Sequence, residues 1–67
     1  MQLSARNQLK GKVKSVKSDS LTAEVIVDVG GNELVSSITR TSADALALKA
    51  GDAVTVIIKA SEVLIAK

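Results

Sequence analysis

The strongest constraint on the fold is a period-two pattern over positions 21–29, in which every odd-numbered position is apolar. The odd-numbered positions carry Leu, Ala and three Val residues, whereas the even-numbered positions carry Thr, Glu, Ile and Asp. A period of two predicts a β-strand with one buried face. Gly30-Gly31-Asn32 follows, and both residue types tolerate the positive φ of a tight hairpin turn. We therefore expect a hairpin whose returning strand covers residues 33–39.

Other β-branched and apolar segments predict more strands on either side of this hairpin. In the lysine-rich segment upstream, Val13 and Val16 are the apolar anchors. Their spacing of three residues breaks strict alternation and indicates a β-bulge. The further strands are expected at residues 10–17, 53–59 and 62–66, with residues 3–8 as one more short strand.

A single helix is expected before the last two strands. Thr41 and Asp44 have the spacing of a capping box, and the Ala and Leu residues that follow predict a short helix near residues 42–49. Gly51 can end it. Five to six short strands with one helix before the last pair are typical of a small OB-like Greek-key barrel. We therefore expect a mainly β fold of that type.

The chain is so short that we expect its core alone to provide too little stability for the folded state. Its 67 residues are expected to form one domain, residues 1–67, with only a small core. Cys and His are absent, so neither a disulfide nor a Cys/His metal site can add stability. Association of several copies is the remaining common route. Val35, Ile57 and Leu64 lie opposite the main core sets and are expected to need a partner surface.

The composition argues against several classes of function. Without His, Cys, Tyr or Trp, a serine nucleophile would have only Lys or a carboxylate as its base, so we expect no enzyme activity. The acidic residues lie in separate elements, which argues against a bound metal cation. We see no signal peptide and no apolar run of bilayer length, and so expect a cytoplasmic protein with no membrane partner. The net charge of +2 fits small anions and permits nucleic acid.

The upstream strand is basic, and two interpretations of its lysines are open. Lys10, Lys12 and Lys14 share one strand face, and Lys17 lies beyond them. An OB-like barrel with a basic strand can bind single-stranded nucleic acid, but the chain has no aromatic residue on which bases could stack. The other interpretation is a solvated face that prevents edge-to-edge pairing of strands. We favour the second, and expect nucleic acid not to be a partner.

Two segments near opposite ends of the sequence each combine a fixed cation with hydroxyls and small residues. Arg6 and Lys59 supply the charge, and alanine side chains are small enough to let an ion reach the backbone N–H groups. Such a set of donors suits an oxyanion and suits neither a metal cation nor acid–base catalysis. Taken singly, each residue also has an ordinary role, such as a helix cap or a surface ion pair. The candidate oxyanion-binding residues are Ser4, Ala5, Arg6, Thr39, Ser42, Lys59, Ala60 and Ser61.

Four sequence elements, in order and covering essentially the whole chain, resemble the Mop family of molybdate-binding proteins, the molbindins. These elements are Ser4-Ala5-Arg6-Asn7-Gln8-Leu9-Lys10-Gly11, Ile38-Thr39-Arg40-Thr41-Ser42, Leu48-Lys49-Ala50-Gly51-Asp52-Ala53-Val54 and Ile58-Lys59-Ala60-Ser61-Glu62-Val63. The resemblance implies a TOBE-type OB-like barrel. It also implies a hexamer built as a trimer of dimers, with tetrahedral oxyanions held at subunit interfaces.

The resemblance also implies ligands and a function. It places ligands on residues 4–6 and 59–61, with Thr39 and Ser42 at central hydroxyl positions. The implied role is storage or homeostasis of molybdate or tungstate, which would be a bound ligand rather than a catalytic cofactor. A cage fitted to the larger ion would hold sulfate poorly. The alternatives are a single-strand nucleic-acid binder and, ranked third because the chain is expected to stand alone, a regulatory module that docks on another protein.

Overall fold

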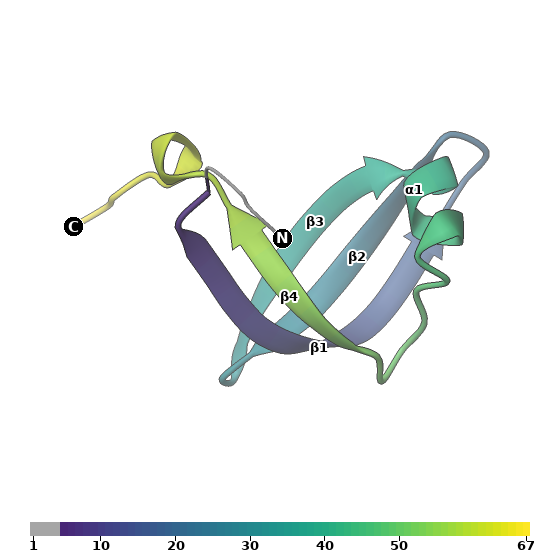
Figure 1. Cartoon of the computed structure of the whole chain (residues 1–67), viewed down its shortest axis with the longest axis horizontal. Coiled ribbons are helices and arrows are strands. Elements are labelled where there is room, and N and C mark those ends of the chain that lie inside the picture. Colours follow the sequence, from purple (N-terminus) through teal and green to yellow (C-terminus); the bar gives the residue numbers. More distant parts are fainter. Residues whose placement is uncertain (1–4) are drawn as a thin grey trace.

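The computed structural model describes residues 5–67 and is mainly β (Figure 1). Four antiparallel strands form one sheet in the order β3-β2-β1-β4 within the described residues. A short helix lies between β3 and β4, and a single 3-10 turn follows β4. The elements are β1 (Asn7–Ser18), β2 (Thr22–Val29), β3 (Asn32–Thr39), α1 (Arg40–Ala45), β4 (Ala53–Ile58) and η1 (Ala60–Glu62).

Strand β1 organises the sheet because it pairs with two neighbours along different halves of its length. Its first half, from Asn7 to Lys12, pairs with β4, and its second half, from Lys12 to Ser18, pairs with β2. The register with β2 shifts between Val13 and Ser15, which confirms the predicted bulge. The ribbon of β1 is strongly curved (Figure 1), as a bulge promotes. The result is the curved sheet of an OB-like fold.

The β2–β3 hairpin is the one that the alternation predicted. Val29 is the partner of Asn32, so Gly30 and Gly31 alone form the turn. Both glycines have positive φ, +56° and +88°, as this tight turn requires. The N–H of Gly31 also donates to Oδ1 of Asp28 at 3.0 Å.

The core lies on the concave face of the sheet and is small. Val13, Val25 and Val27 are buried at its centre. Six half-buried residues pack around them: Val16, Val29, Ile38, Leu48, Val54 and Val56. One predicted core residue, Leu21, is 77% exposed because β2 begins only at Thr22. Among the described residues no polar side chain is buried, so apolar contacts alone specify the interior.

The predicted number of strands was too high. Of the expected strand over residues 3–8, Asn7 and Gln8 belong to the start of β1, Ala5 and Arg6 precede it without regular structure, and residues 3–4 lie outside the described residues. Residues 62–66 do not form the expected last strand: η1 ends at Glu62, and the chain continues without regular structure. A strand requires a hydrogen-bonding neighbour. Within one described chain this segment has none.

The predicted helix boundaries were also wrong. The helix spans residues 40–45, and its N-cap is Thr39, whose Oγ1 accepts a hydrogen bond from the Ser42 N–H at 3.1 Å. The capping pair is therefore two residues upstream of the expected Thr41–Asp44 pair. After Leu46 the chain turns through Ala47, at φ +49°, so that Leu48 packs against the core. The helix therefore ends four residues before the predicted position, and Leu48 packs against the core instead of continuing it.

Candidate anion-binding site

Pairing of β1 with β4 brings the two predicted cationic segments to one end of the sheet. Asn7 is the partner of Ile58, so Arg6 immediately precedes and Lys59 immediately follows a paired position. Both side chains are exposed, and Ala5 is half-buried. Ser4, the remaining predicted ligand of the first segment, lies outside the described residues. We call residues 5–6 and 59–61 the cationic end of the molecule.

Local backbone structure explains how the second segment can donate hydrogen bonds. Lys59 is the N-cap of η1, with φ −64° and ψ 134°, and its side chain makes no capping bond. The first N–H groups of a helical turn have no acceptor within that turn. Ala60 and Ser61 occupy these positions, and both are exposed. One turn is too short for a helix dipole to matter, so these N–H groups are individual donors.

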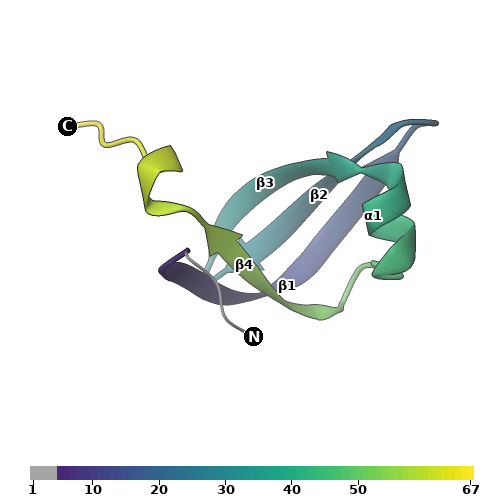
Figure 2. The same ribbon diagram turned by 45° about the horizontal axis from the view of Figure 1, so that its top comes forward.

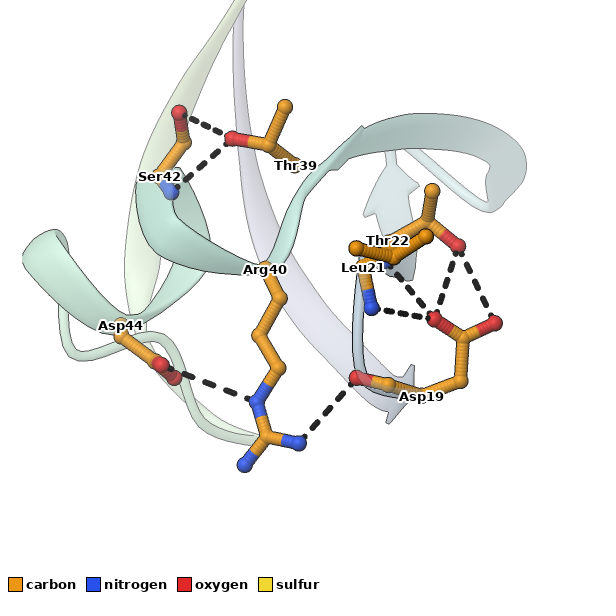
Figure 3. A network of polar contacts seen from close by, with 7 residues as sticks. All are labelled: Asp19, Leu21, Thr22, Thr39, Arg40, Ser42 and Asp44. Atoms are coloured by element: carbon orange, nitrogen blue, oxygen red, sulfur yellow. Dashed lines mark hydrogen bonds and ion pairs between the residues drawn. The ribbon is translucent and has the colours of Figure 1, made fainter.

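Thr39 and Ser42 form a second polar group, which we call the hydroxyl pair. The Thr39 Oγ1 donates to Oγ of Ser42 at 2.8 Å and accepts from the Ser42 backbone N–H at 3.1 Å (Figure 3). The hydroxyl hydrogen of Thr39 is therefore already used. That of Ser42 is left to donate outward, and its oxygen accepts a hydrogen bond, which strengthens it as a donor.

The hydroxyl pair and the cationic end lie far apart in one chain. Thr39 pairs with Thr22, and the neighbouring Ala23 pairs with Ser18 at the far end of β1. The cationic end adjoins Asn7 at the start of β1. The twelve residues of β1 therefore lie between the two groups, a path of about 36 Å along this curved strand at ~3.3 Å per residue, in a molecule whose longest extent is 35 Å. Figures 1 and 2 both show α1 and the C-terminal segment at opposite extremes of the molecule.

The sequence did not reveal the network that holds the hydroxyl pair in place (Figure 3). Nη1 of Arg40 donates to the carbonyl oxygen of Asp19 at 3.1 Å, and its Nε lies 3.7 Å from Oδ2 of Asp44. The backbone N–H of Arg40 also donates to the carbonyl of Leu21 at 2.8 Å. Arg40 therefore ties the start of α1 to the turn between β1 and β2, which fixes the position of Thr39.

The Asp19 side chain builds that turn. Its Oδ1 accepts hydrogen bonds from the N–H groups of Leu21 and Thr22, both at 2.8 Å. The Thr22 bond first, and then the Leu21 bond, lower the pKa of Asp19 below its ordinary value because they favour the charged carboxylate. The spacing of an Asp three residues before a Thr was the local signal for this turn. Nothing local indicated the contact with Arg40.

The lysines of β1 are largely matched by carboxylates. Nζ of Lys14 forms an ion pair with Glu33, and that hydrogen bond raises the pKa of Lys14. Lys12 lies opposite Asp28 and Lys17 lies opposite Glu24 in the β1–β2 register. A basic face paired with acidic residues on the neighbouring strands suits a solvated sheet surface better than a track for a phosphate backbone.

Two further features bear on the chemistry of the described residues. Residues 5–67 contain no group of three or more His, Cys, Asp or Glu side chains placed to hold a metal ion. Nor does this part of the chain contain a helix whose length and apolarity would let it cross a membrane. The fold and the donor set thus define a class of protein: a small OB-like β domain that carries cations at one end and hydroxyls at the other.

Comparison with known proteins places the chain more closely. The family model described as the TOBE domain matches residues 3–65. The "Molybdenum-pterin-binding protein 1" of Clostridium pasteurianum is 46% identical over 66 residues, which cover 97% of each chain. The chain belongs to the TOBE-domain family and, within it, to the Mop proteins whose motifs it carries.

Solved structures agree with this assignment. A molybdate-binding protein from Sporomusa ovata superposes with a TM-score of 0.95 at 39% identity, and the match covers 100% of both chains. The protein MopII from Clostridium pasteurianum superposes with a TM-score of 0.91 at 42% identity, covering 98% of this chain and 100% of the other. The strand arrangement described above is therefore that of a Mop-type domain.

Proposed function

We propose that this protein binds molybdate or tungstate as a cytoplasmic store or buffer of the oxyanion, with residues 1–67 acting as one binding domain. The observation that carries the proposal is the pairing of Asn7 with Ile58, because it sets Arg6 beside the Lys59–Ser61 segment. The similarity to proteins named for molybdenum and molybdate supports it. No catalytic role is proposed, since the sequence lacks the His, Cys and Tyr side chains that commonly serve as bases or nucleophiles.

The chemistry required of the site is simple. Arg6 and Lys59 offset the charge of a dianion, and the exposed N–H groups of Ala60 and Ser61 fill oxygen lone pairs. The Ser61 hydroxyl, with Ser4 and Ala5 on the other segment, completes the proposed donor set at this end. Charge-assisted hydrogen bonds of this kind are about twice as strong as neutral ones.

A metal–pterin compound is a less suitable ligand than the free oxyanion. A pterin ring is flat and aromatic, and proteins bind such rings by stacking aromatic side chains on them. This chain contains no Phe, Trp or Tyr. Its candidate donors are small and cationic, and they match the oxygens of a tetrahedral anion. We therefore assign the inorganic oxyanion as the ligand.

We infer that the site is completed by other copies of the chain. Both cations are exposed in a single copy, where solvent weakens their attraction for an ion. Covering the cationic end with a second copy would exclude water and strengthen each contact. The hydroxyl pair, at the far end of β1, can reach the same ion only from a different copy. A hexamer arranged as a trimer of dimers would satisfy both conditions.

Exposed apolar side chains support such an assembly. Val35 is 66% exposed and Ile57 is 41% exposed, as expected of residues that face away from the core. On so small a domain, apolar surface of this kind is typical of subunit contacts.

Isothermal titration calorimetry with molybdate, tungstate, sulfate and phosphate tests the proposal. A preformed cage sized for the larger ions should bind molybdate and tungstate more tightly than sulfate, whose shorter bonds leave slack hydrogen bonds. Phosphate, which carries a proton near neutral pH, should bind weakly. Equal or tighter binding of sulfate would refute the assignment.

A further inference from the structure

The hydroxyl pair lies where the β2–β3 ladder ends, and the ladder alone holds it weakly. Thr39 is the last residue of β3, and its partner Thr22 is the first residue of β2, so the two form the terminal pair of that ladder. Strand β3 is also an edge of the described sheet, with a strand on one side only. The ends and edges of a sheet are the parts that open most easily.

Packing of the helix adds little to this support. Helix α1 has six residues, all of them described, and Ala43 is its one buried side chain. A helix of this length has no stability of its own and depends on tertiary contacts. A single buried alanine supplies few of these contacts. The position of Ser42, two residues into the helix, must therefore depend on other interactions.

The side chain of Arg40 provides two such interactions. Its Nη1 donates to the carbonyl oxygen of Asp19 at 3.1 Å, and its Nε lies 3.7 Å from Oδ2 of Asp44 (Figure 3). One contact reaches the turn between β1 and β2, and the other reaches the helix itself. Both nitrogens belong to one planar guanidinium, so the two contacts restrain each other's direction.

The acceptor in the β1–β2 turn is itself fixed. The N–H of Asp19 donates to the carbonyl oxygen of Thr22 at 2.9 Å. In return, Oδ1 of Asp19 accepts from the N–H groups of Leu21 and Thr22, both at 2.8 Å. The turn is thus closed by its backbone and by its side chain. A hydrogen bond to this carbonyl therefore holds Arg40 against a rigid part of the fold.

Two observations separate this role from those of ligand and of stabilising ion pair. Figure 3 shows the guanidinium directed toward Asp19 and Asp44, away from the side chains of Thr39 and Ser42. The side chains of Arg40 and Asp44 are 48% and 70% exposed, and an ion pair so exposed adds little to the stability of a fold. The contacts of Arg40 restrain geometry more than they add stability.

We propose that Arg40 is a positioning residue of the anion site, which sets the affinity for the ion without touching it. Its side chain holds the junction of β3 and α1 so that the Ser42 hydroxyl is already directed outward when the ion binds. A donor that is ordered in advance costs less affinity than one that must be ordered on binding. This inference rests on the proposed function and deepens it.

Hydrogen exchange measured by NMR tests the positioning directly, without any anion. R40A removes both side-chain contacts but keeps the backbone hydrogen bond from residue 40 to Leu21. The Ser42 N–H, which is bonded to Oγ1 of Thr39, should exchange at least about fivefold faster in R40A, with the central amides of β2 unchanged. Unchanged exchange at Ser42 would overturn the proposal.

Calorimetry with molybdate measures the effect on binding. R40A should raise Kd about three- to tenfold, the equivalent of ordering one side chain. The matched control K17A removes the same charge from an exposed residue near the same end of β1, and should bind like wild type. The ratio of the two Kd values, R40A to wild type, should not change between about 50 and 500 mM NaCl, because salt screens charges and not geometry. A ratio that falls toward one would show a distant charge effect and overturn the proposal.

A double-mutant cycle tests whether Arg40 acts through the hydroxyl pair. If it does, R40A has little left to disturb once the Ser42 hydroxyl is gone. The double variant R40A/S42A should then bind molybdate at most about twofold more weakly than S42A alone. Losses that multiply in the double variant would mean that the two residues act independently, and would overturn the proposal.

Assembly and stability are checked on the same samples. R40A should keep the wild-type subunit number by size-exclusion chromatography with light scattering, and its thermal unfolding midpoint should stay close to that of wild type. Loss of assembly, or a large loss of stability, would mean that Arg40 has a structural role instead, and the proposal would fail.

The outcomes for Arg40 are separable from those for the proposed function. If wild type binds molybdate and R40A binds it equally well, the proposed function stands and the role of Arg40 is refuted. If wild type gives no heat with molybdate, the proposed function fails, and the positioning role fails with it, whatever the exchange rate at Ser42.

Discussion

The two ends of this small sheet differ in how much of their structure one chain supplies. At the α1 end, hydrogen bonds join Thr39 to Ser42 and Arg40 to Asp19, and the hydroxyl pair is held in a defined geometry. At the cationic end, Arg6 and Lys59 are exposed, and Leu64 and Ile65 beyond them are almost wholly exposed. A single copy of the chain therefore fixes the geometry of the α1 end. The cationic end carries residues suited to binding an anion, but we propose that it needs a second copy to complete the site.

This difference follows from where the contacts lie in the sequence and in space. The α1 end is formed by a cap, an Asp turn and one long-range arginine, all of which a single chain can satisfy. The cationic end carries fixed positive charge and apolar side chains, which are favourable only when a counter-charge and a covering surface arrive. In such a protein, ligand binding and assembly are expected to reinforce each other.

The largest expected effect is loss of charge at the cationic end. K59A should weaken molybdate binding by roughly 2–5 kcal/mol, as when one member of a buried charge pair is removed, which is about 30-fold to several thousand-fold in Kd. Calorimetry measures this directly, and R6A should behave in the same way. The matched control K49A removes an exposed lysine from the turn before β4. Normal binding by K59A would place the site elsewhere.

A second large effect is expected at Gly11 of β1, whose backbone lies tightly against β2. A Cβ at this position would lie 2.6 Å from the carbonyl oxygen of Asp28 and 2.8 Å from a methyl group of Val27. We expect G11A to lower the free energy of unfolding by about 1–3 kcal/mol, the usual cost of overpacking. Chemical denaturation checks this. G30N is the control, since its turn site is open and Asn tolerates positive φ. Wild-type stability in G11A would mean that the strands separate without cost.

A smaller effect is expected in the hydroxyl pair, where two substitutions separate a role in helix capping from a role in anion binding. T39V removes the oxygen that caps α1 and should destabilise the fold by about 1 kcal/mol. S42A keeps the capped N–H but removes the Oγ that accepts from Thr39 and donates outward, so it should destabilise the fold less than T39V while molybdate binding weakens about tenfold. Thermal unfolding and calorimetry on both variants decide the point. If S42A binds molybdate normally, the hydroxyl pair serves only as a cap.

The smallest expected effect is a pH dependence confined to the α1 end. The lowered pKa of Asp19 means that its carboxylate stabilises the folded state fully above its ordinary pKa of about 4. That contribution is lost as the pH falls through the lowered value. The midpoint of thermal unfolding should therefore fall more between pH 7 and pH 3 in wild type than in D19N. E62Q, which alters an exposed carboxylate at the other end, should keep the wild-type slope.

The sequence predicted contacts between residues close together in the chain better than contacts between residues far apart in it. The β2–β3 hairpin and the bulge after Val13 were predictable because each depends on neighbouring residues. The start of α1 was predicted two residues late, because Thr39 with Ser42 and Thr41 with Asp44 both look like caps and only the packing of Leu48 decides between them. The strand predicted over residues 62–66 does not form in the described chain, where this segment has no hydrogen-bonding neighbour.

The candidate site shows the same limits. The adjacency of Arg6 and Lys59 depends on the β1–β4 register, which no local pattern encodes, and the resemblance to the Mop family supplied it. The contact between Arg40 and Asp19 spans 21 residues and had no local signal. The separation of the hydroxyl pair from the cationic end could not be foreseen from residue types alone, because it depends on the full length of β1.

The measurement that most directly tests the account is native mass spectrometry of the full chain, titrated with molybdate, for wild type and K59A. We predict that wild type is oligomeric and that bound oxyanions appear only on the oligomer, while K59A assembles and carries few or none. Bound molybdate on a monomer, or an oligomer of K59A that retains its full complement of ions, would contradict the claim that the cationic ends form the site between copies.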